Sequence, residues 1–185
     1  MLSRRDFAVA LATIPAGMSI AGAAVEAADA PKAAAVVGGD GISRNAAAIH
    51  QEIAFKSSRK RVYAALTDAE QFEKVVRLSV AATSGMVKPG APARISREPG
   101  GDFSLFAGYI SGRQLEFVPE ERLVQAWRTA SWNPGLYSIV EFQFADQGSG
   151  TRLILDQRGF PEEEAEHLAQ GWHMNYWAPL EKYLG

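Results

Sequence analysis

The sequence contains no cysteine, which excludes disulfide bonds, thiol catalysis and cysteine-ligated metal sites. It also lacks an excess of positive charge, because 19 Lys and Arg against 21 Asp and Glu give a net charge of −2. Nucleic-acid binding needs a concentrated basic face, so this balance argues against it. The basic cluster Arg59-Lys60-Arg61 lies in a short predicted helix, where we interpret it as a solvated face.

Residues for catalysis and metal binding are also scarce. The three histidines, His50, His167 and His173, include no pair with His-x-x-x-His spacing. Glu163 and His167 are four apart on a predicted helix, and we interpret them as a solvated pair. No Gly-x-Ser-x-Gly elbow occurs, and the glycine-rich residues 37–41 lack the lysine of a nucleotide loop. We therefore predict no metal and no cofactor, and we favour a binding domain over an enzyme.

The N-terminus reads as an export signal. Arg4 and Arg5 precede Phe7, an uncharged alanine-rich stretch runs to Val25, and small residues continue to Ala30. This order predicts a signal peptide of the twin-arginine type over residues 1 to about 30, and hence a periplasmic or otherwise exported protein. An uncleaved membrane anchor is the alternative. Residues 31–47 are rich in glycine and alanine, and we predict that they form a linker before a domain at 48–185.

The 24 residues from Pro161 to Leu184, next to the C-terminal Gly185, predict one long amphipathic helix. Three glutamates follow Pro161, which suits the positive end of a helix dipole. Apolar residues recur at helical spacing, at Ala165, Leu168, Ala169, Trp172, Tyr176, Leu180, Tyr183 and Leu184. So much apolar surface needs a large partner, and we expect the strands between Ala93 and Arg158 to supply it.

Those strands come in close succession. Residues 49–55 alternate apolar and polar, two short helices follow from Ser57 or Ser58 and from Thr67 or Asp68, and residues 79–92 read as a loop. Strands are then predicted at 93–98, 102–106, 109–118, 122–128, 137–145 and 151–158. Short turns between neighbours indicate an antiparallel order. We predict an α+β helix-grip fold, a curved antiparallel sheet of about seven strands wrapped on the long C-terminal helix.

Several short motifs point to a family. They are residues 101–106, Gly112-Arg113, residues 118–128, residues 150–153, residues 159–161 and Gly171-Trp172. In this order they resemble the SRPBCC superfamily, and within it the domain named after the activator of the ninety-kilodalton heat-shock-protein ATPase, over roughly residues 48–184. The superfamily resemblance implies a START-like, helix-grip fold, and its members include lipid carriers, hydrophobic-ligand receptors and aromatic cyclases. The family name implies a co-chaperone.

Aromatic residues mark the candidate site. We expect Trp127, Trp172 and Tyr176 to meet between helix and sheet, either as ordinary core or around an apolar cavity. Gln157 shares a strand face with Leu153 and Leu155, and Asn175 lies near the inner edge of the helix. The predicted ligand is a hydrophobic or lipid-like small molecule, bound by Trp127, Gln157, Trp172, Asn175 and Tyr176. The alternatives are a protein-interaction module and an enzyme of the cyclase or dehydratase type.

Overall fold

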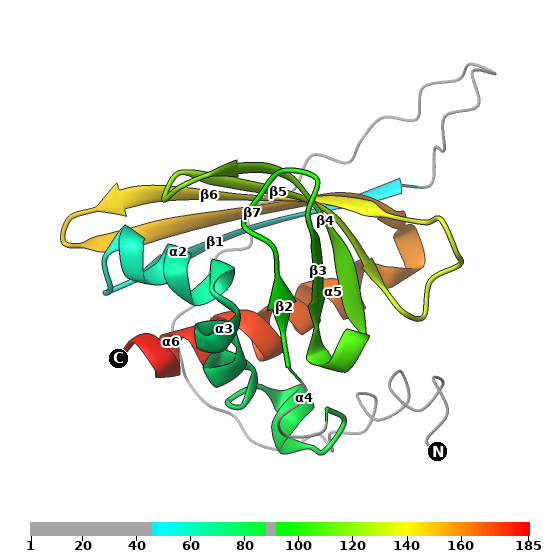
Figure 1. Cartoon of the computed structure of the whole chain (residues 1–185), viewed down its shortest axis with the longest axis horizontal. Coiled ribbons are helices and arrows are strands. Elements are labelled where there is room, and N and C mark those ends of the chain that lie inside the picture. Colours follow the sequence, from blue (N-terminus) through cyan, green and yellow to red (C-terminus); the bar gives the residue numbers. More distant parts are fainter. Residues whose placement is uncertain (1–45, 88–91) are drawn as a thin grey trace.

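The computed structural model describes residues 46–87 and 92–185 (Figure 1). The predicted signal peptide and most of the predicted linker lie outside these residues. Strand β1 (Ala46–Phe55) is followed by helices α2 (Arg59–Thr67), α3 (Ala69–Val76) and α4 (Val80–Thr83). The strands β2 (Arg94–Ile95), β3 (Asp102–Leu105), β4 (Ile110–Val118), β5 (Arg122–Thr129), β6 (Ser138–Gln147) and β7 (Gly150–Pro161) come next. A 3₁₀ turn, η1 (Phe106–Gly108), separates β3 from β4.

All seven strands form one antiparallel sheet in the order β1-β7-β6-β5-β4-β3-β2. Strands β2 to β7 pair in sequence order because short connections join them. Strand β1 forms one edge of the sheet and pairs with β7. The helices lie together beneath the curved sheet, and the C-terminal helix crosses its inner face (Figure 1). The predicted α+β fold class is confirmed.

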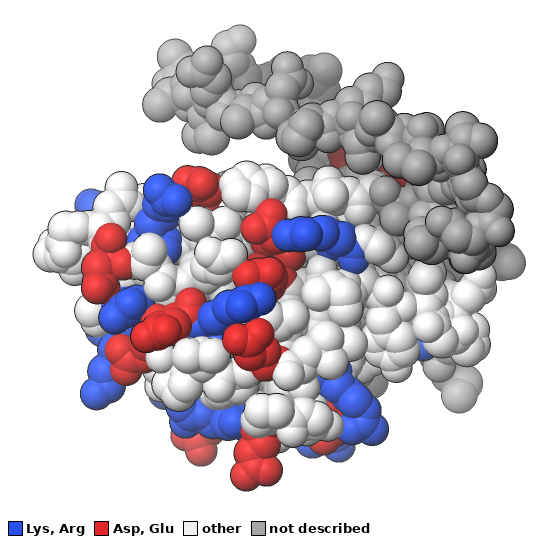
Figure 2. All heavy atoms as spheres, turned by 90° about the horizontal axis from the view of Figure 1, so that it is seen from above, with Lys and Arg blue, Asp and Glu red and all other residues white. Residues whose placement is uncertain are grey.

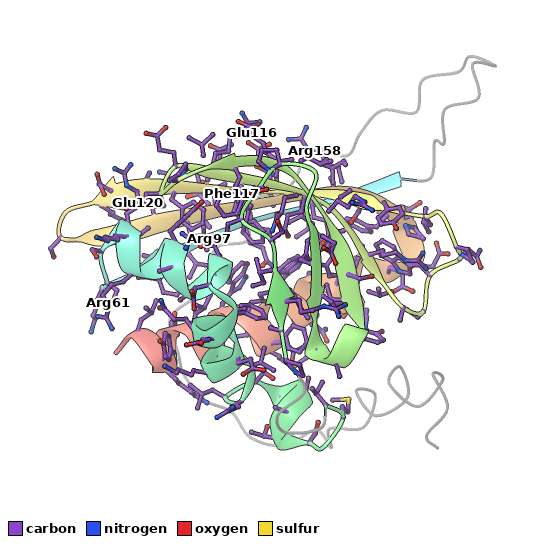
Figure 3. The ribbon with its side chains drawn as sticks, in the orientation of Figure 1. Arg61, Arg97, Glu116, Phe117, Glu120 and Arg158 are labelled. Carbon is purple, nitrogen blue, oxygen red and sulfur yellow. The ribbon has the colours of Figure 1, made fainter. Side chains whose placement is uncertain are left out.

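The two faces of the sheet differ because side chains alternate along each strand. The inner face is buried, and on β6 and β7 it carries Val140, Phe142, Phe144, Leu153 and Leu155, as the alternation predicts. The outer face carries mixed charges, which stand side by side with uncharged residues (Figure 2). Glu116 and Arg158 point away from the helices (Figure 3).

Ion pairs link neighbouring strands on this outer face. Arg122 Nε lies 3.0 Å from Glu141 Oε1, and Arg122 Nη1 lies 3.5 Å from Glu116 Oε2. Nearby, His50 Nδ1 lies 2.9 Å from Asp156 Oδ1. In the basic cluster on α2, Lys60 and Arg61 are exposed, with Arg61 projecting from the body of the domain (Figure 3), and the partly buried Arg59 pairs with Asp146 at 3.4 Å. A face of balanced charge needs no further cover, so the helices collect on the apolar side.

The C-terminal helix differs from the prediction in where it begins and in how it is wound. Strand β7 continues to Pro161, and the helix begins with a 3₁₀ turn, η2 (Glu162–Glu164). An α-helix, α5 (Ala165–Trp172), a π-helical turn, η3 (His173–Trp177), and a second α-helix, α6 (Ala178–Leu184), then follow without a break. Within η3 the Ala178 N–H donates to the His173 carbonyl five residues earlier, which inserts one residue into the helical register.

Two other segments correct the prediction. Residues 79–92 are not all loop, because the Ser79 hydroxyl caps α4 by accepting from the Ala82 N–H at 3.2 Å. The predicted strand at 93–98 is only the two-residue β2, because the chain turns at Gly100, whose φ of 81° suits glycine.

Strand β1 begins at Ala46, two residues inside the segment predicted to be a linker. Because β7 runs on to Pro161, it offers pairing partners to Ala46 and Ala47. These two residues therefore join the sheet despite their weak strand signal.

In the described part of the chain, no helix is both long and apolar enough to cross a membrane.

Candidate functional site

A cavity of about 50 Å³ lies between the C-terminal helix and one end of the inner sheet face. Helix α4, turn η1, strands β4 and β5, helix α5 and turn η3 each contribute to its wall. The lining is mostly apolar or aromatic: Ala81, Phe106, Tyr109, Ile110, Trp127, Thr129, His167, Leu168, Gly171, Trp172, Asn175 and Tyr176. Tyr109, His167, Gly171 and Asn175 are only partly buried, so the cavity lies close to the surface on their side.

The structure brings together the three aromatic residues that the sequence singled out. The Trp172 ring centre lies 4.4 Å from that of Tyr176 and 5.7 Å from that of Trp127, and all three residues line the cavity. Phe106 and Phe72 extend the cluster, with ring centres 5.5 and 5.6 Å from Tyr176. These rings therefore belong to the buried core, and they also line a small space.

Gln157 is fully buried but is not part of the cavity wall. Its Oε1 accepts from the Trp172 Nε1–H at 2.7 Å, and its Nε2–H donates to the Ser138 hydroxyl at 2.9 Å. Ser138 in turn donates to the Trp127 carbonyl at 3.1 Å. We predicted that a ligand would engage Gln157, whereas both ends of its carboxamide bind other residues of the domain. This chain of hydrogen bonds holds the C-terminal helix against the sheet.

Asn175 does line the cavity, and it also has a structural partner. Its Oδ1 accepts from the Ala81 N–H at 2.9 Å. Ala81 belongs to α4 and is buried, so this bond holds the short helix α4 against η3 at the cavity's edge. This contact occupies Oδ1 and leaves only the amide N–H groups of Asn175 for the predicted ligand.

Sequence reasoning missed Trp177, which is 3% exposed and stacks on Trp172 with ring centres 5.5 Å apart and planes 13° apart. In an α-helix, residues five apart point about 140° away from each other, so Trp177 falls outside the apolar stripe. The π turn reduces this difference, because its i→i+5 hydrogen bonds place more residues in each turn than an α-helix has. The Trp177 Nε1–H donates to Gln51 Oε1 at 2.6 Å, and Gln51 Nε2–H donates to the Ala169 carbonyl at 3.1 Å. The sequence did hold one signal for this: Trp177 is a large apolar residue on the side of the helix that the α-helical pattern assigns to solvent.

Two residues of the cavity wall each carry a buried polar atom that reaches no described residue in full hydrogen-bond geometry: Trp127 Nε1 and the Tyr176 hydroxyl. Burial raises the pKa of the Tyr176 phenol well above its usual value, and an imperfect hydrogen bond with the Trp127 side chain opposes this only in part. Tyr176 is therefore a neutral hydroxyl at physiological pH, able to donate a hydrogen bond.

The rest of the lining offers little for catalysis. It includes no carboxylate, lysine or arginine, and His167 and the two tyrosines are its titratable side chains. The paired acid and base that a cyclase or dehydratase needs is not provided by this wall. Within residues 46–87 and 92–185, no group of three or more metal-binding side chains comes together.

Comparison with known proteins agrees with the fold. The human protein "Activator of 90 kDa heat shock protein ATPase homolog 1" is 34% identical over 95 residues, which cover 51% of this chain and 28% of that protein. Homolog 2 of mouse is 26% identical over 137 residues, covering 74% of this chain and 38% of that protein. The chain thus matches well under half the length of these curated relatives.

Among solved structures, the HSP90 activator PFC0360w of Plasmodium falciparum superposes with a TM-score of 0.60 at 25% identity, covering 76% of this chain and 96% of that one. CalU16 of Micromonospora echinospora superposes with a TM-score of 0.57 at 21% identity, covering 76% of each chain, which supports the fold alone.

The profile of the family "Activator of Hsp90 ATPase homolog 1-like protein" matches residues 56–185, which include all the helices described above and every strand but β1. The chain belongs to this family.

Proposed function

We propose that the protein is an exported, non-catalytic domain that binds a compact apolar molecule in the cavity between α5–η3 and the sheet. The observation that carries the proposal is the cavity itself, whose wall is largely apolar and which lies close to the surface beside Tyr109 and His167. Ligand sites are concave and mostly apolar, with a few polar groups that set orientation.

The volume of the cavity limits the ligand. Drug-sized ligands occupy pockets of roughly 300–1,000 Å³, whereas this cavity is about 50 Å³. That is room for a few water molecules or a small ring. Of the predicted hydrophobic and lipid-like ligands, the geometry thus favours a compact molecule over a long acyl chain.

Intrinsic fluorescence offers a direct test, because all four tryptophans of the sequence are buried and in one cluster. The full-length protein would be titrated with compact cyclic molecules and, for comparison, with palmitate. We expect a saturable change in emission with the compact molecules.

Gly171→Leu provides the control, because Gly171 lines the cavity and its Cβ position meets nothing within 4 Å. A leucine there should fill the space and abolish the fluorescence response while far-UV circular dichroism stays unchanged. A response that survives in Gly171→Leu, or no response in the wild type to any compact molecule, would show that this cavity is not a binding site.

A second candidate, a protein-interaction domain of the co-chaperone type, is favoured by the 34% identity to a protein named as an activator of the 90 kDa heat shock protein ATPase. The test is the ATPase rate of that chaperone with increasing amounts of this protein. An increase that Gly171→Leu does not alter would support an interaction surface separate from the cavity.

Export is also a proposal, supported by Arg4, Arg5 and Phe7 followed by the uncharged stretch. Replacement of both arginines by lysine keeps the charge but removes the paired-arginine signature. We expect this variant to stay with the cytoplasmic fraction while the unaltered protein leaves it. Equal distribution of the two would contradict the twin-arginine assignment.

A further inference from the structure

The charges on the outer face of the sheet are unevenly distributed, although they are balanced over the face as a whole. Toward the β6–β7 turn the arginines pair with carboxylates: Arg122 Nε lies 3.0 Å from Glu141 Oε1, and Arg152 Nε lies 3.5 Å from Glu52 Oε2. Toward the other end of the strands, the arginines belong to none of the ion pairs among the described residues: Arg94, Arg113, Arg128 and Arg158. That end of the face therefore carries positive charge without a local counter-charge.

The strand register places these arginines in two adjacent rows across the sheet, which we call the basic rows. The first row connects register partners from β7 to β3: Arg158, Ile139, Ala126, Arg113 and Asp102. The second row connects register partners from β5 to β2: Arg128, Ser111, Ser104 and Arg94. Asp102 is the one carboxylate in the basic rows, so arginines outnumber carboxylates there by four to one.

Exposed apolar side chains lie among these arginines. Ile139 is 44% exposed and is the register partner of Arg158. Tyr137, just before β6, is 46% exposed, and the Arg128 guanidinium lies 5.5 Å from the centre of its ring. Arg128 also donates to the Trp132 carbonyl at 2.6 Å, which fixes the position of its charge. Arginine beside exposed aromatic and aliphatic side chains is the composition of protein-binding surfaces.

The spacing of the exposed arginines suits an extended acidic chain. Neighbouring strands lie about 4.8 Å apart, so Arg158 on β7 and Arg113 on β4 are separated by about 14 Å. An extended peptide rises about 3.3 Å per residue, so acidic side chains about four residues apart span this distance, with an intervening residue over Ile139. Arg113 Nη1 donates to the Gly100 carbonyl at 2.9 Å, which leaves its other N–H groups for a carboxylate. Arg158 points away from the helices and is exposed (Figure 3).

We propose that the basic rows bind an extended acidic segment of a partner protein. Its carboxylates pair with Arg113 and Arg158, and an apolar residue between them covers Ile139. This surface lies on the face of the sheet opposite the C-terminal helix and the cavity, so the proposal goes beyond the binding of a small molecule and does not depend on it.

The test uses a fluorescein-labelled peptide in which glutamates have this spacing and a leucine lies midway between them. The full-length protein is titrated into the peptide, and binding is followed by fluorescence polarisation. We expect saturable binding, which Arg113→Ala combined with Arg158→Ala weakens by roughly fivefold or more. Arg122→Ala combined with Arg152→Ala is the matched control, because it removes the same charge from the same face at arginines that already have partners. The control should change the affinity by less than about twofold.

The apolar part of the surface is tested separately. Ile139→Ser should weaken peptide binding by about threefold, because it removes apolar area that the leucine covers. Leu78→Ser is its control, since Leu78 is 39% exposed and lies between α3 and α4, away from the sheet. A peptide with glutamine in place of each glutamate should not bind, because it has no charge to pair with the arginines.

Several results would overturn the proposal: no binding of the acidic peptide, equal binding of the glutamine peptide, or equal weakening by the two pairs of arginine substitutions. Vesicles of phosphatidylserine and phosphatidylcholine test the remaining alternative. If the protein binds these vesicles through Arg113 and Arg158 but does not bind the peptide, the surface recognises a lipid headgroup and the proposal is wrong. The substituted side chains are exposed, so far-UV circular dichroism should be the same in all variants.

Discussion

At the scale of single residues, glutamine side chains connect the C-terminal helix to the sheet. Gln157 and Gln51 lie on the adjacent strands β7 and β1, and each accepts from a tryptophan of the helix. A carboxamide both accepts and donates, so each glutamine binds a second group as well. The polar atoms inside this aromatic core thus fix how the helix sits on the sheet.

Gln157→Leu should destabilise the protein by about 1–3 kcal/mol, because it leaves the Trp172 N–H and the Ser138 hydroxyl buried without their partner. Chemical denaturation measures the free energy of unfolding. Gln143→Leu serves as the control, because it makes the same substitution at a solvent-exposed position on β6. Equal losses in the two variants would show that the buried network contributes nothing particular.

His50 gives a prediction about pH. Its hydrogen bond to Asp156 raises the pKa of the imidazole above 6.5, and Glu52 acts in the same direction while partial desolvation opposes them. A raised pKa means that the folded state binds the proton more tightly than the unfolded state, so the contribution to stability is present below pH 6.5. It is lost as the pH rises through the raised value.

We therefore expect His50→Gln to destabilise the protein more at pH 5.5 than at pH 8, as measured by denaturation at both values. The effect should be small, because the side chain is 48% exposed. His173→Gln, on the exposed side of the helix, controls for the loss of a histidine. A larger effect of His50→Gln at pH 8 would reverse the sign of this argument.

At the scale of elements, glycines show where the backbone needs space and where it does not. A Cβ at Gly112 of β4 would overlap the Ala126 carbonyl oxygen and lie 2.5 Å from the Phe103 ring. The same atom at Gly171 of α5 would meet nothing within 4 Å. Glycine is thus required in the strand, whereas in the helix it keeps the cavity open.

Gly171→Ala should stabilise the protein by about 0.5–1 kcal/mol, because alanine favours the helix and restricts the unfolded chain. Gly112→Ala should destabilise it by more than about 2 kcal/mol, since main-chain atoms cannot move aside. Thermal unfolding of both variants measures the two effects. A loss of stability in Gly171→Ala would mean that the helix packs more tightly there than the structure shows.

At the scale of the whole molecule, the two ends of the domain are built into one core. Strand β1 pairs with β7, and α6 buries Pro179, Leu180 and Leu184 close to α2 and α3. The Ser57 hydroxyl, just before α2, donates to the Leu184 carbonyl at 3.3 Å. Because contacts from both ends cover the same sheet, we expect the domain to unfold in one cooperative step.

Removal of residues 178–185 should therefore abolish cooperative unfolding, although it leaves every strand in place. Loss of the buried Leu180 and Leu184 exposes apolar surface of α2 and α3, which should appear as binding of a hydrophobic dye. The full-length protein is the reference. A truncated chain with an unchanged sharp melting transition would show that α6 is dispensable.

The sequence by itself determined the sheet, the order of its elements and the face that packs inward. These follow from alternation along β6 and β7, from short turns between strands and from one long apolar stripe, all of which are local patterns. It also pointed to Trp127, Trp172 and Tyr176 as rings that meet, and the structure places them together.

Only the tertiary structure decided which polar groups have partners and how large the cavity is. Gln157 binds Trp172 across the sheet and helix, and Gln51 binds Trp177, which is far away in the chain and is turned inward by the π turn. No local period in the sequence encodes either contact. The same holds for the 50 Å³ of space, since a cavity is what remains after every side chain has packed. Local patterns fix which side chains face inward, but the fit among those side chains is a property of the whole fold.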